Sequence, residues 1–197
     1  MFKDKDTFNI IGYSFGSLLC LELASILEKS GKKGKLVLID GAPLFLKKLV
    51  SSHIFDNEEG RQNYMLSTII AIVFPEDCEY ITKNVITNPT WEEKLDKLVE
   101  FTSKQNIYSN NYMKNITNAL VIRTKLLTDL DVDVFKTLQS TPLSLIRPTE
   151  ASVIEIDEDY ALQNYCQQRI NLQFVDGNHI TVLDNLKLIE IINSIIK

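Results

Sequence analysis

Cysteine, histidine and tryptophan are scarce in this sequence of 197 residues, which contains 3, 2 and 1 of them. The cysteines, Cys20, Cys78 and Cys166, are odd in number and far apart. This pattern argues against a disulfide framework and against a cysteine-based metal site. We therefore expect reduced thiols, a cytoplasmic protein and no bound metal.

Long apolar runs and an excess of positive charge are also missing. The longest apolar run, residues 69–74, is far too short to cross a bilayer, and the opening MFKDKD mixes charges instead of forming the basic start of a secretory signal. The formal net charge of −5, without a basic and aromatic patch, disfavours nucleic acid as a partner. With 45% hydrophobic residues and no repeats, the chain is expected to fold around a substantial core.

A serine between two glycines stands out near the start, where Ser14 lies between Gly12 and Gly16 in GYSFG. Residues 7–11 before it are typical of a strand, and a helical pattern follows. A tight turn between strand and helix projects the serine Oγ above the sheet and aims the next backbone N–H, that of Phe15, at a developing oxyanion. Such a turn is expected to leave no room for side chains at the two glycines. An ordinary glycine-rich turn is the alternative.

The helix after this turn is predicted to end near Lys29, with Gly31 as its C-cap. Four apolar residues share one face of it at helical spacing: Leu19, Leu23, Ile26 and Leu27. The arrangement of strand, turn and helix is the one that a nucleophilic serine requires.

A serine nucleophile needs a histidine base, and the chain offers His53 and His179. His53 lies in a polar stretch and is expected at the surface. His179 follows the alternating run 170–174, typical of a strand, and the turn residues 176–178. It is therefore predicted beyond the carboxyl end of a strand, where ligands collect in open α/β sheets. A loop histidine held only by hydrogen bonds is the alternative.

The acid that orients the base is less sharply defined. Asp40 follows the buried-looking strand 36–39, and Gly41 and Pro43 turn the chain behind it. These residues favour Asp40, although an aspartate that merely ends a strand would look the same. The order serine, acid, histidine is that of α/β-hydrolases, many of which place the acid one strand later, near Glu150. The other candidates are Asp131, Asp133, Asp157, Asp176 and Asp184.

Five segments together resemble the thioesterase domain of animal-type fatty acid synthases. They are GYSFGSLLCLELASILEKSG, LVLIDGAP, LSLIRPTEA, DYALQNYC and VDGNHITVLDN, in this order. The resemblance begins near Phe8, continues to the end and is weakest through the middle of the chain. It places the acid in an Asp-Gly-[Ser/Ala]-Pro segment and the histidine in a Gly-x-His segment. It therefore implies Ser14 as nucleophile, Asp40 as acid and His179 as base.

The same resemblance implies a reaction and a partner. The reaction is hydrolysis of a long-chain acyl thioester from the phosphopantetheine arm of an acyl carrier protein, which releases a free fatty acid and needs no other cofactor. The carrier domain is expected in cis, within a fatty acid synthase. A polyketide or nonribosomal peptide release thioesterase, which shares the fold and the acid position, is one alternative. A non-catalytic remnant is the other.

Roughly a hundred residues lie between Asp40 and the next predicted strand at 143–147, far more than a normal connection between two elements of a sheet. We expect an α/β core with a mostly parallel sheet, made of residues 1–44 and 141–197, and an inserted helical lid at 45–140. Helices are predicted within the lid at 59–74, 91–103 and 108–130.

The most apolar lid segment, residues 64–74, favours a buried helix. The alternative is that some of its side chains line a groove for an acyl chain, namely Met65, Ile69, Ile72 or Phe74.

Little of the chain precedes the strand that leads to Ser14, whereas α/β-hydrolases carry several strands and helices there, and one loop among them supplies a second oxyanion N–H. We therefore expect a fragment, a truncated gene product, or a chain completed by another chain. Loss of one oxyanion donor lowers rates roughly a hundred- to a thousand-fold, and residues 7–11 would form an open sheet edge. Little or no activity is expected from the chain as it stands.

Overall fold

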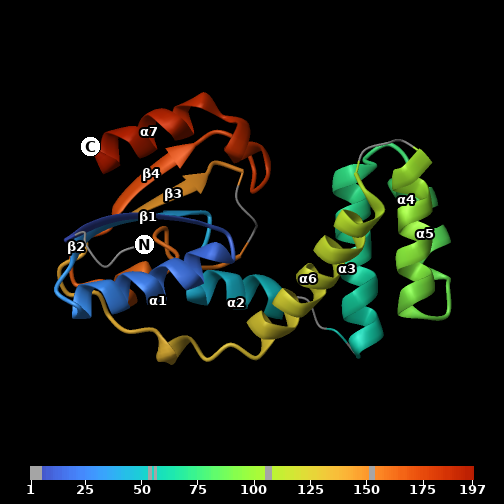
Figure 1. Ribbon diagram of the computed structural model, residues 1–197, viewed down its shortest axis with the longest axis horizontal. Helices are drawn as coiled ribbons and strands as arrows, with labels where there is room; N and C mark the ends of the chain where they lie inside the picture. Colours follow the sequence, from blue (N-terminus) through green and yellow to red (C-terminus); the bar gives the residue numbers. More distant parts are fainter. Residues whose placement is uncertain (1–5, 53–54, 56, 105–107, 151–153) are drawn as a thin grey trace. The chain divides into compact units, whose positions relative to one another are not determined.

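The computed structural model describes residues 6–52, 55, 57–104, 108–150 and 154–197 (Figure 1). The chain separates into two compact units. The α/β unit takes both ends of the chain, up to Ser52 and from Leu130 onward. The helical unit runs from residue 53 to Asp129.

The α/β unit contains a four-stranded sheet in which every neighbouring pair is parallel, in the order β1-β2-β3-β4. The strands are β1 (Thr7–Tyr13), β2 (Lys33–Ile39), β3 (Leu143–Pro148) and β4 (Asn171–Val175). Since parallel strands run in one direction, their carboxyl ends lie at one edge of the sheet, where residues 14, 40 and 176–179 follow three of them. The parallel α/β architecture predicted from the sequence is confirmed.

Helices cover both faces of this sheet. They are α1 (Gly16–Lys29) and α7 (Leu186–Ile196), and the unit also contains α2 (Pro43–Ser51) and the short 3-10 helices η1 (Val132–Val134), η2 (Leu162–Tyr165) and η3 (Thr181–Asp184). In Figure 1, α1 and α7 lie on opposite faces of the sheet. The central strand β2 is therefore buried on both sides, which explains its continuous apolar run of Leu36, Val37 and Leu38.

The face of α1 that packs on the sheet is not the predicted one. Leu19, Leu23 and Ile26 are 65%, 36% and 53% exposed, and only Leu27 of the predicted face is buried. Two apolar stripes run along this helix. The buried stripe contains three leucines and three small residues, and the small residues allow the helix backbone to lie close to the strands. The leucines are Leu18, Leu21 and Leu27, and the small residues are Ser17, Ala24 and Ser25.

Glu28, near the end of α1, fastens the segment that leads into β3. Its carboxylate accepts hydrogen bonds from the backbone N–H groups of Gln139 at 2.7 Å and Thr141 at 2.8 Å, and from the Thr141 hydroxyl at 2.5 Å. Burial raises the pKa of Glu28, but the hydrogen bonds favour the charged form and bring the pKa below its usual value.

The free energy of unfolding of the Glu28→Gln variant is expected to be about 1 kcal/mol lower than that of the wild type at neutral pH, because hydrogen bonds to a charged group are lost. The loss stays this small because the carboxylate is partly exposed to solvent. Because the pKa of Glu28 is lower in the folded state than its ordinary value of 4.5, the charged carboxylate stabilises the fold at any pH above 4.5. That stabilisation is lost as the pH falls through the folded-state pKa. Urea unfolding at neutral and acidic pH should therefore show a difference that shrinks in acid. Glu22→Gln, an exposed change on the same helix, is the control. A pH-independent difference would contradict the role of the charge.

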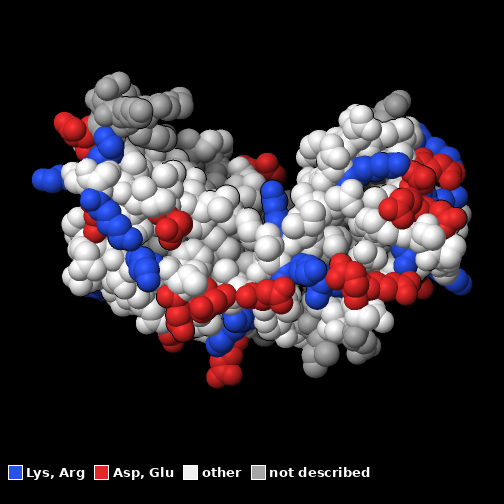
Figure 2. Space-filling view, turned by 60° about the horizontal axis from the view of Figure 1, so that its bottom comes forward, with Lys and Arg blue, Asp and Glu red and all other residues white. Residues whose placement is uncertain are grey.

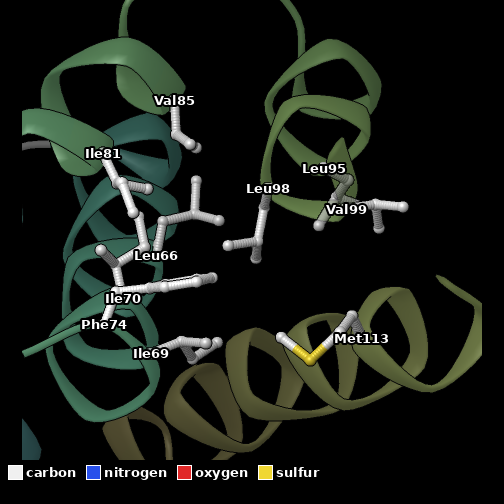
Figure 3. Packing of buried hydrophobic residues seen from close by; sticks show 10 residues of the cluster. All are labelled: Leu66, Ile69, Ile70, Phe74, Ile81, Val85, Leu95, Leu98, Val99 and Met113. Atoms are coloured by element: carbon white, nitrogen blue, oxygen red, sulfur yellow. The ribbon is translucent and has the colours of Figure 1, made fainter. Parts of the chain in front are cut away.

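The helical unit packs four helices around one apolar core (Figures 1 and 3). They are α3 (Glu58–Val73), α4 (Cys78–Ile86), α5 (Trp91–Lys104) and α6 (Asn110–Thr128). The core is formed by apolar side chains from the four helices and the residue after α3: Leu66, Ile69, Ile70, Phe74, Ile81, Val85, Leu95, Leu98, Val99 and Met113. The described residues contain no helix long and apolar enough to cross a membrane.

One charged side chain lies inside this helical unit. Lys94 is only 2% exposed, and its Nζ lies 2.7 Å from a Glu59 carboxylate oxygen and 2.9 Å from the Asn63 amide oxygen. Both partners belong to α3, so the buried ammonium ties α5 to α3. On the face shown in Figure 2, basic and acidic side chains are interspersed over the helical unit. Lys97 and Glu100 of α5 form an ion pair at the surface of this unit, with Nζ 2.7 Å from the carboxylate oxygen.

The two units divide the chain at other positions than the expected residues 45 and 140. The α/β unit also includes α2 and residues 130–140. One reason is that Phe45 of α2 stacks on Tyr160, with ring centroids 3.9 Å apart. Another is that Leu138 pairs with Cys166 in an isolated bridge.

Candidate active site

Ser14 occupies the turn between β1 and α1. Its φ of 53° lies in the left-handed region, which few residues other than glycine adopt. The Ser14 N–H donates to the Ile39 carbonyl at 2.9 Å, and the Ser14 carbonyl accepts from Ser17 N–H at 2.9 Å. These two bonds hold a sharp connection between strand and helix at the carboxyl edge of the sheet, as the serine motif requires.

Glycines around this turn have unequal roles. A Cβ on Gly12 would lie 2.8 Å from Cys20 Sγ and 2.9 Å from Ser17 Cα, so no side chain fits there. A Cβ on Gly16 would meet nothing within 4 Å among the described residues. The prediction that the turn excludes a side chain at Gly16 is wrong, because this first residue of α1 faces open space. Gly41, which the sequence assigns only to the turn behind Asp40, also packs against the serine turn, because its Cβ would lie 2.4 Å from the Ser14 carbonyl oxygen.

Asp40 and His179 come together at the same edge of the sheet. Asp40 directly follows β2, with a φ of 44°, and its N–H donates to the Ile146 carbonyl at 2.9 Å. His179 lies in the loop after β4, and its Nδ1 is 2.6 Å from Asp40 Oδ2. Asp40 is 3% exposed, whereas the His179 side chain is 40% exposed. Because an ionised carboxylate only accepts hydrogen bonds, such a contact needs the proton on Nδ1, and in that tautomer Nε2 is the basic nitrogen.

No other candidate acid contacts the imidazole among the residues that the structure describes. Asp176 approaches Thr149 at 3.4 Å, and Asp131 accepts a hydrogen bond from the Asp133 backbone. Among the described residues, Glu150, Asp157 and Asp184 also form no hydrogen bond or ion pair with the ring. His53, expected at the surface, lies outside the described residues.

Tyr13 joins the serine turn to the histidine. Its ring stacks on the His179 imidazole with centroids 4.9 Å apart, and its hydroxyl donates to the His179 carbonyl at 2.6 Å. Burial, and then the negative charge of Asp40, raise the pKa of Tyr13 to about 12, so the phenol remains a neutral donor near pH 7. The residue directly before Ser14 therefore fixes both the ring and the backbone of His179.

Tyr160 contacts the other end of the acid. Its hydroxyl donates to Asp40 Oδ1 at 2.6 Å. The sequence reasoning named neither Tyr13 nor Tyr160, although Tyr160 lies in DYALQNYC, one of the segments that carry the family resemblance. That segment was the available signal.

The Ser14 hydroxyl itself makes no hydrogen bond to another residue in the described part of the chain. The structure therefore brings the acid and the base into contact, and it does not join the serine to the base. Hydrogen bonds of this kind often tighten only when a substrate is bound.

No protein-family model and no curated protein matches this sequence. Solved structures have a similar fold. The wild-type Vlm2 thioesterase domain is 19% identical, with a TM-score of 0.58 over 94% of this chain and 66% of that chain. The Vlm2 domain bound with a dodecadepsipeptide is 15% identical, with a TM-score of 0.60 over 96% of this chain and 68% of that one.

A longer protein contains the same fold. Holo-AB3403, a four-domain nonribosomal peptide synthetase, is 12% identical, with a TM-score of 0.65 over 94% of this chain and 14% of that chain. This chain thus spans 66% of the wild-type Vlm2 domain and a small part of the synthetase. The described residues adopt an α/β fold that is shared with these thioesterase domains.

Proposed function

We propose that this chain is a serine thioesterase in which Ser14 is the nucleophile, His179 the base and Asp40 the acid that orients the base. The single observation that carries the proposal is the 2.6 Å contact between His179 Nδ1 and a buried Asp40, at the sheet edge that also carries Ser14. The shared fold with thioesterase domains supports it.

The proposed reaction starts at the Ser14 hydroxyl. Nε2 of His179 takes the hydroxyl proton while Oγ attacks the thioester carbonyl, and the buried Asp40 carboxylate stabilises the imidazolium that forms. The tetrahedral intermediate collapses, the C–S bond breaks, and the departing thiolate takes the proton from His179 to leave as the thiol. A water molecule, activated by the same nitrogen, then hydrolyses the acyl-enzyme to a carboxylic acid and restores Ser14.

The negative charge of the intermediate needs donors nearby. The proposed donor is the backbone N–H of Phe15, which caps α1 with a φ of −54°. Since the N-terminus of a helix carries a partial positive charge, α1 would add to the stabilisation of the oxyanion.

The proposed substrate is a long-chain fatty acyl group on the phosphopantetheine arm of an acyl carrier protein, in cis within a synthase, and no other cofactor is required. The motifs that resemble fatty acid synthase thioesterases support this choice.

A second candidate function is the release of a peptide or polyketide chain from its carrier. It is favoured by a specific observation, since the solved structures with a similar fold include a thioesterase domain bound with a dodecadepsipeptide and a nonribosomal peptide synthetase.

A fluorophosphonate probe tests the serine nucleophile. The wild-type chain is expected to be labelled, with the adduct located at Ser14 by peptide mass spectrometry, and the Ser14→Ala chain is expected to remain unlabelled. The reaction requires only an activated serine, so it does not depend on complete turnover. A correctly folded sample that is not labelled would sink the serine hydrolase and favour the non-catalytic remnant.

The two substrate classes are separated by competition with the same probe. Palmitoyl-pantetheine is expected to slow labelling of Ser14 at lower concentrations than a peptidyl- or polyketide-pantetheine does, because it would occupy the serine as an acyl-enzyme. Stronger protection by the peptidyl or polyketide thioester would favour the second candidate.

A further inference from the structure

We infer that Tyr160 is a positioning residue that holds the Asp40 carboxylate in the orientation in which it serves His179. The inference deepens the proposed function and depends on it, because it assigns a role at the same site. It adds to the three side chains of the proposed site a fourth residue that acts through Asp40 and does not touch the substrate.

The first observation is the environment of the carboxylate. Asp40 is 3% exposed, and a buried carboxylate needs a donor at each oxygen to offset the loss of water. Oδ2 faces His179 at 2.6 Å, and Oδ1 accepts from the Tyr160 hydroxyl at 2.6 Å. In the described part of the chain these are the side-chain hydrogen bonds of Asp40. The phenol therefore occupies one oxygen and leaves the other for the imidazole.

The second observation is how firmly the phenol is held. Tyr160 is fully buried, and its ring is parallel to that of Phe45, with an interplanar angle of 1° and centroids 3.9 Å apart. The Arg147 guanidinium lies 4.3 Å from the same ring centroid, and Arg147 Nη1 donates to the Glu158 carbonyl at 2.5 Å. Burial, and then the hydrogen bond to Asp40, raise the pKa of Tyr160, so the hydroxyl stays protonated and donates.

The third observation comes from the backbone. Among the described residues, the non-glycine residues with positive φ are Ser14 at 53°, Asp40 at 44°, Tyr160 at 59° and Ala161 at 58°. A bulky residue in this region is a genuine outlier, and such outliers persist where the surrounding structure enforces them. The serine, the acid and the segment that carries Tyr160 therefore share this unusual conformation, and Tyr160 is held in it by its surroundings.

These observations define what the phenol does. A carboxylate with one free oxygen can rotate about its terminal torsion, which is broad and roughly two-fold. The bond from Tyr160 removes that freedom, so Asp40 Oδ2 stays directed at Nδ1 of His179. The imidazole is then held in the tautomer and orientation that leave Nε2 ready to accept a proton.

Tyr160→Phe is the direct test, because it keeps the stacked ring and removes only the donor. We expect the rate of fluorophosphonate labelling of Ser14 to fall about tenfold, since the lost hydrogen bond is made to a charged group. We also expect the acid limb of the pH profile of labelling to move to higher pH. Without the hydrogen bond from the phenol, the Asp40 carboxylate attracts the protonated imidazole more strongly, so the base loses its proton at a higher pH. Tyr165→Phe is the matched control. It changes another buried tyrosine, whose ring faces Phe135, and should leave both quantities unchanged.

A double-mutant comparison separates positioning from packing. If Tyr160 acts through Asp40, the change Tyr160→Phe has no further effect on the labelling rate in an Asp40→Asn chain. An equal loss in both backgrounds, or a wild-type rate and pH profile in Tyr160→Phe, would overturn the inference.

Proton NMR gives a readout that does not require a reactive serine. The Nδ1 proton of His179, bonded to Asp40, is expected as a downfield resonance that is absent in His179→Gln, altered in Tyr160→Phe and unchanged in Tyr165→Phe. If the wild-type chain is not labelled by the probe but this pattern is seen, the proposed function fails while the positioning of Asp40 by Tyr160 stands. If Tyr160→Phe leaves the resonance unchanged, the positioning role fails by itself.

Discussion

His179→Ala is expected to lower the rate of fluorophosphonate labelling of Ser14 about a million-fold, to background, because the substitution removes the proposed base that takes the serine proton. Asp40→Asn is expected to lower it about ten-thousand-fold. The imidazole remains in that variant, but an amide can donate to Nδ1 and so stabilise the wrong tautomer. Time courses of labelling, followed by intact mass, measure both rates.

Folding is the control for this pair. The His179 side chain is 40% exposed, so its truncation should leave the far-ultraviolet circular dichroism and the thermal midpoint close to those of the wild type. Asp40→Asn keeps the volume of a buried side chain. If either folded variant were labelled at the wild-type rate, the assignment of acid and base would be wrong.

Gly41→Ala is expected to be strongly damaging, whereas Gly16→Ala is expected to be tolerated. The new Cβ at residue 41 would lie 2.4 Å from the Ser14 carbonyl oxygen and 2.5 Å from Ser17 Oγ, so backbone has to move. Overpacking of this kind costs about 3 kcal/mol and would displace the turn that carries the nucleophile. At Gly16 the Cβ meets open space among the described residues, and the stability should change by no more than about 0.5 kcal/mol.

Chemical denaturation and labelling rates together check this contrast. Both quantities should fall in Gly41→Ala and stay near the wild-type values in Gly16→Ala. The comparison is informative because Gly16 belongs to the serine motif and Gly41 does not. A damaging Gly16→Ala with a harmless Gly41→Ala would contradict the packing described for the turn.

The strands could be predicted well because each is a short apolar or alternating run bounded by turn residues, as in residues 36–39 before Asp40. The face of α1 could not, because Leu19, Leu23 and Ile26 form a stripe as apolar as the one that is buried. Hydrophobicity alone cannot choose between two such stripes. The choice depends on the small residues, such as Ala24, that let the helix approach the sheet.

Helices α2, α4 and α7 were not predicted, the first two for a related reason. In α2, Pro43 reads equally well as a turn residue and as the first residue of a helix, where its fixed φ is favourable. The other, α4, is short, with only Ile81 and Val85 buried, so its periodic signal is weak.

The candidate site was predictable to the extent that its residues follow strands. Asp40 and His179 come after β2 and β4, and parallel strands bring such positions to one edge. Tyr160 follows no strand directly. It reaches Asp40, 120 positions earlier in the chain, from a place where its ring packs on Phe45 and the Arg147 guanidinium. No pattern of spacing encodes such a contact.

The left-handed backbone at Ser14, Asp40, Tyr160 and Ala161 also bears on how robust this protein can become. Each such residue costs about 1–3 kcal/mol, which is a considerable share of the net stability of about 5–15 kcal/mol typical of a domain. A glycine at Ser14 would relax the turn only by removing the hydroxyl. Ala161 carries no functional group, so a change to glycine there could relieve the backbone strain and raise the thermal midpoint without removing a side chain of the proposed site.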